Sequence, residues 1–162
     1  VVLMTLLCSL CLCWAQATRA QDAAAAPLQS SMTAYLVEKG EDGKETLTEV
    51  NQVKPGQTIE YALRYSNVSD GDLAEVNIVG PVPAGTNYLA GSALPQGGAR
   101  PQFSIDNGAS YKNEPVTYKV KMADGTELEK VATPDMYTHI RWSVGAMTAQ
   151  QQLILTYRVQ VR

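Results

Sequence analysis

Side chains that could perform acid–base or nucleophilic chemistry are few in this chain, and their spacing matches no catalytic motif. The sequence contains a single histidine, His139, and its three cysteines are Cys8, Cys11 and Cys13. There is no glycine-flanked nucleophile elbow, no S-x-x-K or H-E-x-x-H pattern and no glycine-rich phosphate-binding loop. His139 lies in an alternating stretch, where we expect an exposed strand side chain. The residue types therefore argue against an enzyme and predict no cofactor.

Carboxylates could instead bind a metal ion or hydrolyse a glycoside. Glu60 and Glu75 lie on the polar faces of expected strands, where a solvated charge is the ordinary interpretation. Asp70 and Asp72, in the stretch NVSDGDL, could give oxygens to Ca²⁺. Calcium takes about 6–8 oxygen ligands, and the spacing of an EF-hand is absent. We therefore expect a hairpin turn and no metal site, with Asp70 and Asp72 as weak calcium candidates.

The charge balance bears on the kind of partner. The chain has 162 residues, with 13 Lys and Arg against 16 Asp and Glu, which gives a formal net charge of −3. A nucleic-acid-binding domain is expected to carry a strongly basic face. We therefore expect no nucleic-acid partner and favour a protein or cell-envelope partner, with self-association as an option.

The first 15 residues form one apolar run, VVLMTLLCSLCLCWA, followed by small residues around Ala17 and Ala20. The run is shorter than the roughly 20 apolar residues of a membrane-spanning helix. An apolar segment before an A-x-A-like site is typical of a secretory signal peptide. We predict a signal peptide over residues 1–20, cleaved after Ala17 or Ala20, with a retained membrane anchor as the alternative. After cleavage the protein would reach the periplasm, cell surface or exterior, free of the membrane and without cysteine.

The rest of the chain alternates between apolar and polar residues with a period of two, which indicates β-strands. The clearest stretches are 57–66, 116–122, 138–144 and 153–161, and weaker ones lie at 33–38, 46–50, 73–79, 87–90 and 102–105. Turn signals such as Asn107-Gly108 and Asp124-Gly125 separate them. Residues 21–32 are rich in alanine and are predicted to be a flexible leader. Residues 33–162 are predicted to form a single domain.

Strands with one apolar and one polar face belong to antiparallel sheets that pack face to face. The predicted fold is therefore all-β: an immunoglobulin-like antiparallel β-sandwich of about seven to nine strands without a disulfide. A closed barrel is the alternative. The expected core includes the apolar positions of three alternating stretches, with Trp142 as its largest member: Ile59, Tyr61, Leu63, Trp142, Leu155 and Tyr157.

A family resemblance rests on the stretch 53–93 and on the closing strands at 140–161. Its motif comprises a Pro-Gly turn, an Asn that ends a strand and a P-x-G turn, which here are Pro55-Gly56, Asn67 and Pro83 with Gly85. These residues resemble the bacterial conserved-repeat domain known as domain of unknown function eleven. Gly80 replaces the Asp that usually precedes the P-x-G turn, and residues 94–135 match less well. The resemblance implies a β-sandwich in exported or cell-surface proteins, and it implies no activity.

Two functions of different kinds remain open. The first is a non-catalytic structural or adhesive module of the bacterial envelope or surface, binding through loops such as 94–101 and 106–115. The second is a self-assembling filament subunit whose N-terminal segment, residues 21–38, pairs as a donor strand with a neighbour. An enzyme is the third and least favoured alternative.

Overall fold

The computed structural model describes residues 26–162, which form ten strands and one 3-10 turn. The predicted signal peptide, its cleavage site and the three cysteines lie outside the described residues. No helix in residues 26–162 has the length and apolar character needed to cross a membrane. In chain order the elements are β1 (Leu28–Lys39), β2 (Glu45–Glu49), β3 (Thr58–Asn67), β4 (Leu73–Pro81), β5 (Thr86–Tyr88), β6 (Pro101–Ser104), β7 (Thr117–Lys121), β8 (Glu127–Val131), η1 (Pro134–Met136), β9 (His139–Met147) and β10 (Gln152–Val161).

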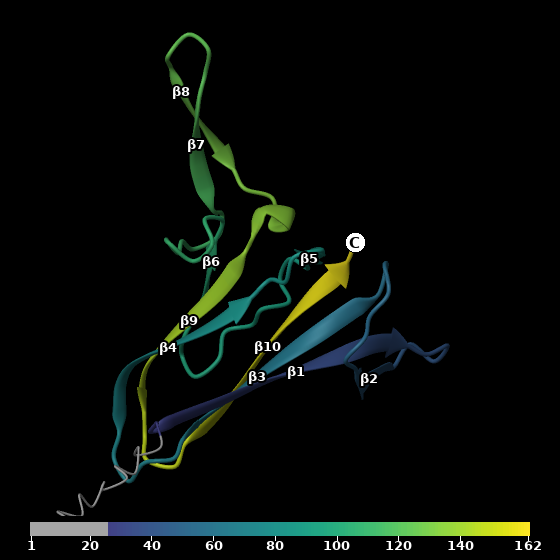
Figure 1. Ribbon diagram of the computed structural model, residues 1–162, viewed down its shortest axis with the longest axis vertical. Helices are drawn as coiled ribbons and strands as arrows, with labels where there is room; N and C mark the ends of the chain where they lie inside the picture. Colours follow the sequence, from purple (N-terminus) through teal and green to yellow (C-terminus); the bar gives the residue numbers. More distant parts are fainter. Residues whose placement is uncertain (1–25) are drawn as a thin grey trace, which may run out of the picture.

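Two antiparallel sheets of unequal width make up the body of the molecule. The wider sheet has the strand order β2-β1-β3-β10-β5, and the narrower has the order β4-β9-β6. The remaining strands, β7 and β8, pair only with each other and stand away from both layers (Figure 1). The prediction of an immunoglobulin-like β-sandwich without a disulfide is confirmed, and the barrel alternative is wrong because the sheets do not close on each other.

The layers meet where the predicted apolar faces point inward. Trp142 on β9 and Tyr157 on β10 are fully buried, and their ring centroids lie 6.4 Å apart across the interface. Ile59, Leu63 and Leu155 are also buried, as predicted. Tyr61 was expected in the core but is only half-buried; it packs against the core from β3, with its ring centroid 5.4 Å from that of Tyr157.

Gly80 on β4 allows the closest approach between the layers. A Cβ atom built on Gly80 would lie 2.7 Å from Cε1 of Tyr157 and 3.0 Å from Cδ1 of Leu63. The Tyr157 hydroxyl donates a hydrogen bond to the carbonyl oxygen of Pro81, the next residue along β4. Tyr157 can therefore pack this close to β4 only because residue 80 has no side chain.

The predicted boundary of the flexible leader is wrong. Residues 28–32 belong to β1, which pairs with β3 from Leu28 opposite Asn67 to Val37 opposite Thr58. The stretch LQSSM has few apolar side chains, so its sequence gives little strand signal. It is held through the backbone ladder, with Leu28 packed against the core.

The placement of residues 116–122 in the sandwich is also wrong. Val116 is buried, but β7 leaves the body immediately afterwards and pairs with β8, a strand that the sequence did not predict. The residues of β8, ELEKV, include few apolar side chains and are all exposed. The hairpin turns at Asp124-Gly125, where the Asp124 carboxylate accepts hydrogen bonds from the amide and hydroxyl of Thr126 at 2.9 and 2.6 Å.

Substitution of Gly80 by alanine tests the close approach of the layers. We expect Gly80→Ala to lower the free energy of unfolding by about 1–3 kcal/mol, the usual cost of overpacking a core. Gly71→Ala is the matched control, because no atom lies within 4 Å of a Cβ at that position. Urea unfolding measures both changes, and an unfolding midpoint of Gly80→Ala equal to that of the parent protein would contradict this account.

Candidate functional site

The β7–β8 hairpin carries an apolar surface that the body of the protein covers only at its base, where Tyr118 packs against the core. Val120 lies directly opposite Leu128, and alternate residues of a strand share one face, so Tyr118, Val120, Met122 and Leu128 lie together. We call these four residues the hairpin face. Met122 and Leu128 are 44% and 47% exposed. An apolar strand face ordinarily packs against another layer, so its exposure here marks a candidate contact surface.

The opposite side of the hairpin is charged. Lys119 on β7 lies across from Glu129, and its Nζ is 2.9 Å from the carboxylate of Glu127 in an exposed ion pair. An exposed pair of this kind contributes little to stability, since its median value is about 0–1 kcal/mol. The hairpin is therefore amphipathic over Lys119–Met122 and its partners, while at its base Lys130 lies on the hairpin face and Val131 on the opposite side.

A concavity of about 420 Å³ lies at the base of the hairpin. Its apolar lining comes from Phe103, Ile105, Val116 and Tyr118, and its polar lining comes from Asp106, Ser110, Lys112 and Lys119. Tyr118 belongs both to this concavity and to the hairpin face, so the two form one continuous surface. A partner that covered the hairpin face would therefore also have access to an apolar hollow between the hairpin and the body.

The loop at this base is held rigidly by Asp106. Its carboxylate accepts hydrogen bonds from the buried Ser104 hydroxyl at 2.6 Å and from the Ser110 amide and hydroxyl at 2.9 and 2.6 Å. The hydrogen bond from Ser104, which has the largest effect, and those from Ser110 hold the pKa of the Asp106 carboxyl well below its usual range. The carboxylate thus organises its own loop.

The two loops that were predicted to bind a partner lie next to each other. Pro95 and Arg100 of the first loop and Asn113 and Glu114 of the second line a concavity of about 340 Å³ beside Phe103. The second loop is tied to the narrower sheet by Tyr111, whose ring lies 4.2 Å from the Arg141 guanidinium. These two loops lie at the end of the molecule from which the hairpin projects, and the hairpin itself was not predicted.

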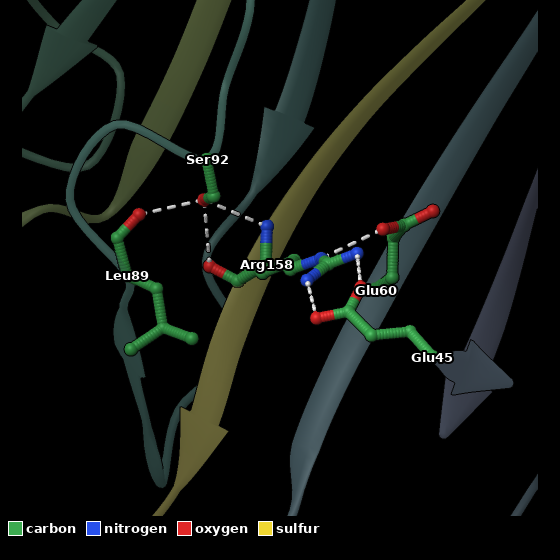
Figure 2. A network of polar contacts seen from close by, with 5 residues as sticks. All are labelled: Glu45, Glu60, Leu89, Ser92 and Arg158. Carbon is green, nitrogen blue, oxygen red and sulfur yellow. Dashed lines mark hydrogen bonds and ion pairs between the residues drawn. The ribbon is translucent and has the colours of Figure 1, made fainter. Parts of the chain in front are cut away.

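The most extensive charged network is on the outer face of the wider sheet (Figure 2). Arg158 on β10 donates through Nε to Glu60 on β3 at 2.8 Å, and through both terminal nitrogens to Glu45 on β2 at 3.2 and 2.8 Å. Ser92 accepts from the Arg158 amide at 2.9 Å and donates to the Leu89 carbonyl at 2.6 Å. The network connects β2, β3, β10 and the turn after β5, and we interpret it as a brace.

The brace shifts the ionisation of its members. Hydrogen bonds from Arg158, with its positive charge, lower the pKa of the Glu45 carboxyl from its ordinary value of 4.5. Hydrogen bonds to Glu45 and Glu60 raise the pKa of Arg158. A concavity of about 270 Å³ lies beside the brace, lined in part by Glu60, Ser92 and Arg158. The polar groups at its rim already bind one another.

The remaining candidates for chemistry are dispersed. His139 is half-buried, and its Nδ1 lies 3.2 Å from the hydroxyl of Thr138. Asp72, a weak calcium candidate, accepts a hydrogen bond from the Ala149 amide at 3.0 Å, and Asp70 is exposed. Within residues 26–162, no group of three or more His, Cys, Asp and Glu side chains is placed to hold a metal ion.

Asn67, from the motif of the resemblance, is 1% exposed and connects two turns. Its Nδ2 lies within hydrogen-bond distance of the carbonyls of Gly71, Met147 and Thr148 at 2.8, 3.2 and 2.9 Å. Its Oδ1 accepts from the amide and hydroxyl of Ser69 at 3.1 and 2.7 Å. Asn67 therefore joins the β3–β4 turn to the β9–β10 turn at one end of the sandwich.

The two other motif turns meet at the opposite end, around the last residues of β10. The amide of Gly56, which follows Pro55, donates to the Val161 carbonyl at 2.9 Å. The amide of Arg162 donates to the Gly85 carbonyl at 2.9 Å, and Pro83 accepts from the amide of Thr86 in the same turn at 3.1 Å. The motif residues thus hold the ends of strands, and none of them lies at the hairpin face or its base.

Comparisons of this chain with protein-family models, with curated proteins and with solved structures give no match.

Exchange of the buried amide for a carboxylate tests the Asn67 junction. In Asn67→Asp an oxygen replaces Nδ2 and faces carbonyl oxygens, so we expect the free energy of unfolding to fall by at least about 2 kcal/mol. Asn51→Asp makes the same chemical change at an exposed loop position and is expected to be neutral. Thermal and urea unfolding of the two variants measure the difference. Equal stabilities would show that the junction does not hold the turns.

Acid should weaken the Arg158 brace. Because the pKa of Glu45 is lower in the folded chain, its stabilising effect is complete above its unfolded pKa near 4.5 and is lost as the pH falls through the folded pKa. The difference in unfolding free energy between the parent and Glu45→Gln should therefore shrink between neutral pH and about pH 3. Glu49→Gln makes the same chemical change at the other end of β2, outside the brace, and is the control. A constant difference for Glu45→Gln would contradict the brace.

Proposed function

We propose that the protein is an exported, non-catalytic β-sandwich module of the bacterial envelope or surface that attaches to a protein partner through the β7–β8 hairpin. The exposed hairpin face is the observation that carries this proposal. The sandwich supplies a scaffold, and the β7–β8 hairpin extends beyond it (Figure 1). Met122 and Leu128 on this hairpin are exposed, so a second protein can reach them. Apolar side chains in the centre of a contact with charged residues around them are typical of protein interfaces.

The surroundings of the hairpin face favour a protein as the partner. The face continues into the hollow at its base, so a protruding apolar side chain of the partner could enter beside Tyr118. Lys112 and Lys119 lie at the margin of that hollow, and the Nζ of Lys112 donates to the Thr117 carbonyl at 2.6 Å. The contact surface therefore combines apolar side chains with charged groups, among them Lys130, which lies opposite Tyr118.

A non-catalytic role agrees with the use that the fold makes of its charged side chains. Arg158 binds two glutamates, and the Asp106 carboxylate accepts from two serines. These groups are committed to holding strands and loops. The export part of the proposal rests on the apolar leader and on the resemblance to the conserved-repeat domain, whose members are found in exported proteins.

Photo-crosslinking from single positions of the hairpin tests the proposal. A photoreactive residue at Leu128, on the hairpin face, is expected to give one adduct of defined mass with an envelope protein in cells that export the chain. The same residue at Glu129 points to the opposite side and is the matched control.

We expect Met122→Ser to weaken the Leu128 adduct several-fold without a change in the unfolding midpoint, because Met122 is 44% exposed. Equal adducts from Leu128 and Glu129, or none from either, would overturn the hairpin as the contact surface. Retention of the chain in the cytoplasm would overturn export, whatever the crosslinking shows.

A further inference from the structure

The N-terminal half of β1 leaves one side of its backbone without a partner strand in the described part of the chain. β2 pairs with β1 only from Tyr35 to Lys39, so residues 28–33 lie beyond its reach. Gln29, Ser30, Ser31 and Met32 are exposed along this segment. We call residues 28–33 of β1 the open edge.

Two hydrogen bonds show which backbone groups of the open edge point away from β3. The Val68 amide donates to the Pro27 carbonyl at 2.8 Å, on the β3 side, and the Val50 amide donates to the Ala34 carbonyl at 3.0 Å, on the β2 side. Along an antiparallel strand the direction of these groups alternates from residue to residue. Leu28, Ser30 and Met32 therefore direct both their amide and their carbonyl groups away from β3 and into the open edge.

The marginal strands β2, β5, β4 and β6 of the two larger sheets are protected against the addition of a strand, whereas residues 152–157 of β10 extend past β5 and also lack a partner strand on that side. β2 carries Glu45 and Glu49, and β5 has only three residues. β4 is interrupted by an irregularity at Glu75, which has φ 56°, and β6 begins with Pro101 and is covered by backbone hydrogen bonds between Phe103 and Lys112. Charge, short length, bulges, proline and covering loops are the usual means of preventing edge pairing. The open edge, with the sequence LQSSMT, has none of them.

We propose that the open edge binds a second copy of this chain, with the two β1 strands antiparallel about a two-fold axis at Ser30. In this register Leu28 faces Met32 of the other copy, Gln29 faces Ser31, and Ser30 faces Ser30. The outward amide and carbonyl groups of Leu28, Ser30 and Met32 would then all pair with their counterparts. The two wider sheets become one continuous sheet across the dimer.

Side chains and neighbouring segments fit this register. No charged residue lies in the open edge, so the two-fold axis opposes no like charges. Met32, now 43% exposed, would lie against Leu28 of the other copy on the inner face of the sheet. A register centred on Ser31 would instead require the Ala34 carbonyl, which is already bound by Val50. Each β1 stays paired with its own β3, which distinguishes this contact from the exchange of a donor strand.

Removal of one outward amide tests the contact. In Ser30→Pro the lost amide belongs to the open edge, so the β1–β3 ladder is kept, and we expect the dimer dissociation constant to rise at least tenfold with little change in the melting temperature. Ser31→Pro is the matched control, because its amide points to β3, and it should lower the melting temperature. Sedimentation equilibrium of the exported form measures the association.

Cysteine substitution tests the register in a second way and does not depend on the folding of a proline variant. Ser30→Cys places two thiols directly opposite each other, about 5.5 Å apart between Cα atoms, and this separation allows a disulfide. Oxidation should therefore give a covalent dimer. Gln29→Cys is the control, because its two copies are diagonal neighbours and too far apart for a disulfide.

A chain that stays monomeric at millimolar concentration, or a dimer unaffected by Ser30→Pro, would overturn the proposal. Efficient crosslinking of Gln29→Cys and not of Ser30→Cys would overturn the register. Leu128→Ser, on the hairpin face, should leave the association unchanged, so a loss of dimer in that variant would assign the contact to the hairpin instead.

Discussion

The fit of Tyr157 beneath Gly80 is the interaction on which the sandwich depends. The ring lies so close to the β4 backbone that a single methyl group at residue 80 would reach 2.7 Å from it. The tyrosine also packs against Trp142 from the opposite sheet and donates to the Pro81 carbonyl. One side chain thus fixes both the separation of the layers and the position of β4 along them. With no cysteine in residues 26–162, packing of this kind takes the place of a disulfide.

The strands that this contact positions are held at their ends by polar groups. Asn67 links two turns at one end, and the Pro-Gly and P-x-G turns bind the end of β10 at the other. Between them, Arg158 ties the outer face of the wider sheet to β2. The two proposed contacts lie outside these tied ends, on the hairpin and on the open edge of β1.

Period-two alternation predicted the fold well, because the apolar face of a strand in a sandwich usually packs against the opposite sheet. It placed Ile59, Leu63, Trp142, Leu155 and Tyr157 in the core, where each is buried. The same rule failed for residues 116–122. Alternation shows that a strand has an apolar face, but it does not show which element covers that face: here Val116 and Tyr118 reach the core of the body, while Met122 is left exposed.

The other differences have equally specific causes. The first residues of β1 and the whole of β8 are held by backbone pairing, and their side chains are too polar to mark a strand. The Arg158 brace unites Glu45 with a residue 113 positions away. Such a contact depends on the order of the strands in the folded sheet, and this order cannot be deduced from the spacing of residues along the chain. Asn67 was singled out through the motif of a resemblance, and its burial and its hydrogen bonds to two turns could not be read from the sequence.

Asn67, Val68 and Ser69 also spell the acceptor sequence for N-linked glycans. In the folded chain the amide nitrogen that would carry the sugar donates hydrogen bonds to carbonyl groups of the protein. A eukaryotic host could attach a glycan only before the chain has folded, and the modified asparagine could no longer enter its site. During secretion from such a host, glycan transfer to Asn67 would compete with folding. A bacterial host without N-linked glycosylation avoids this competition.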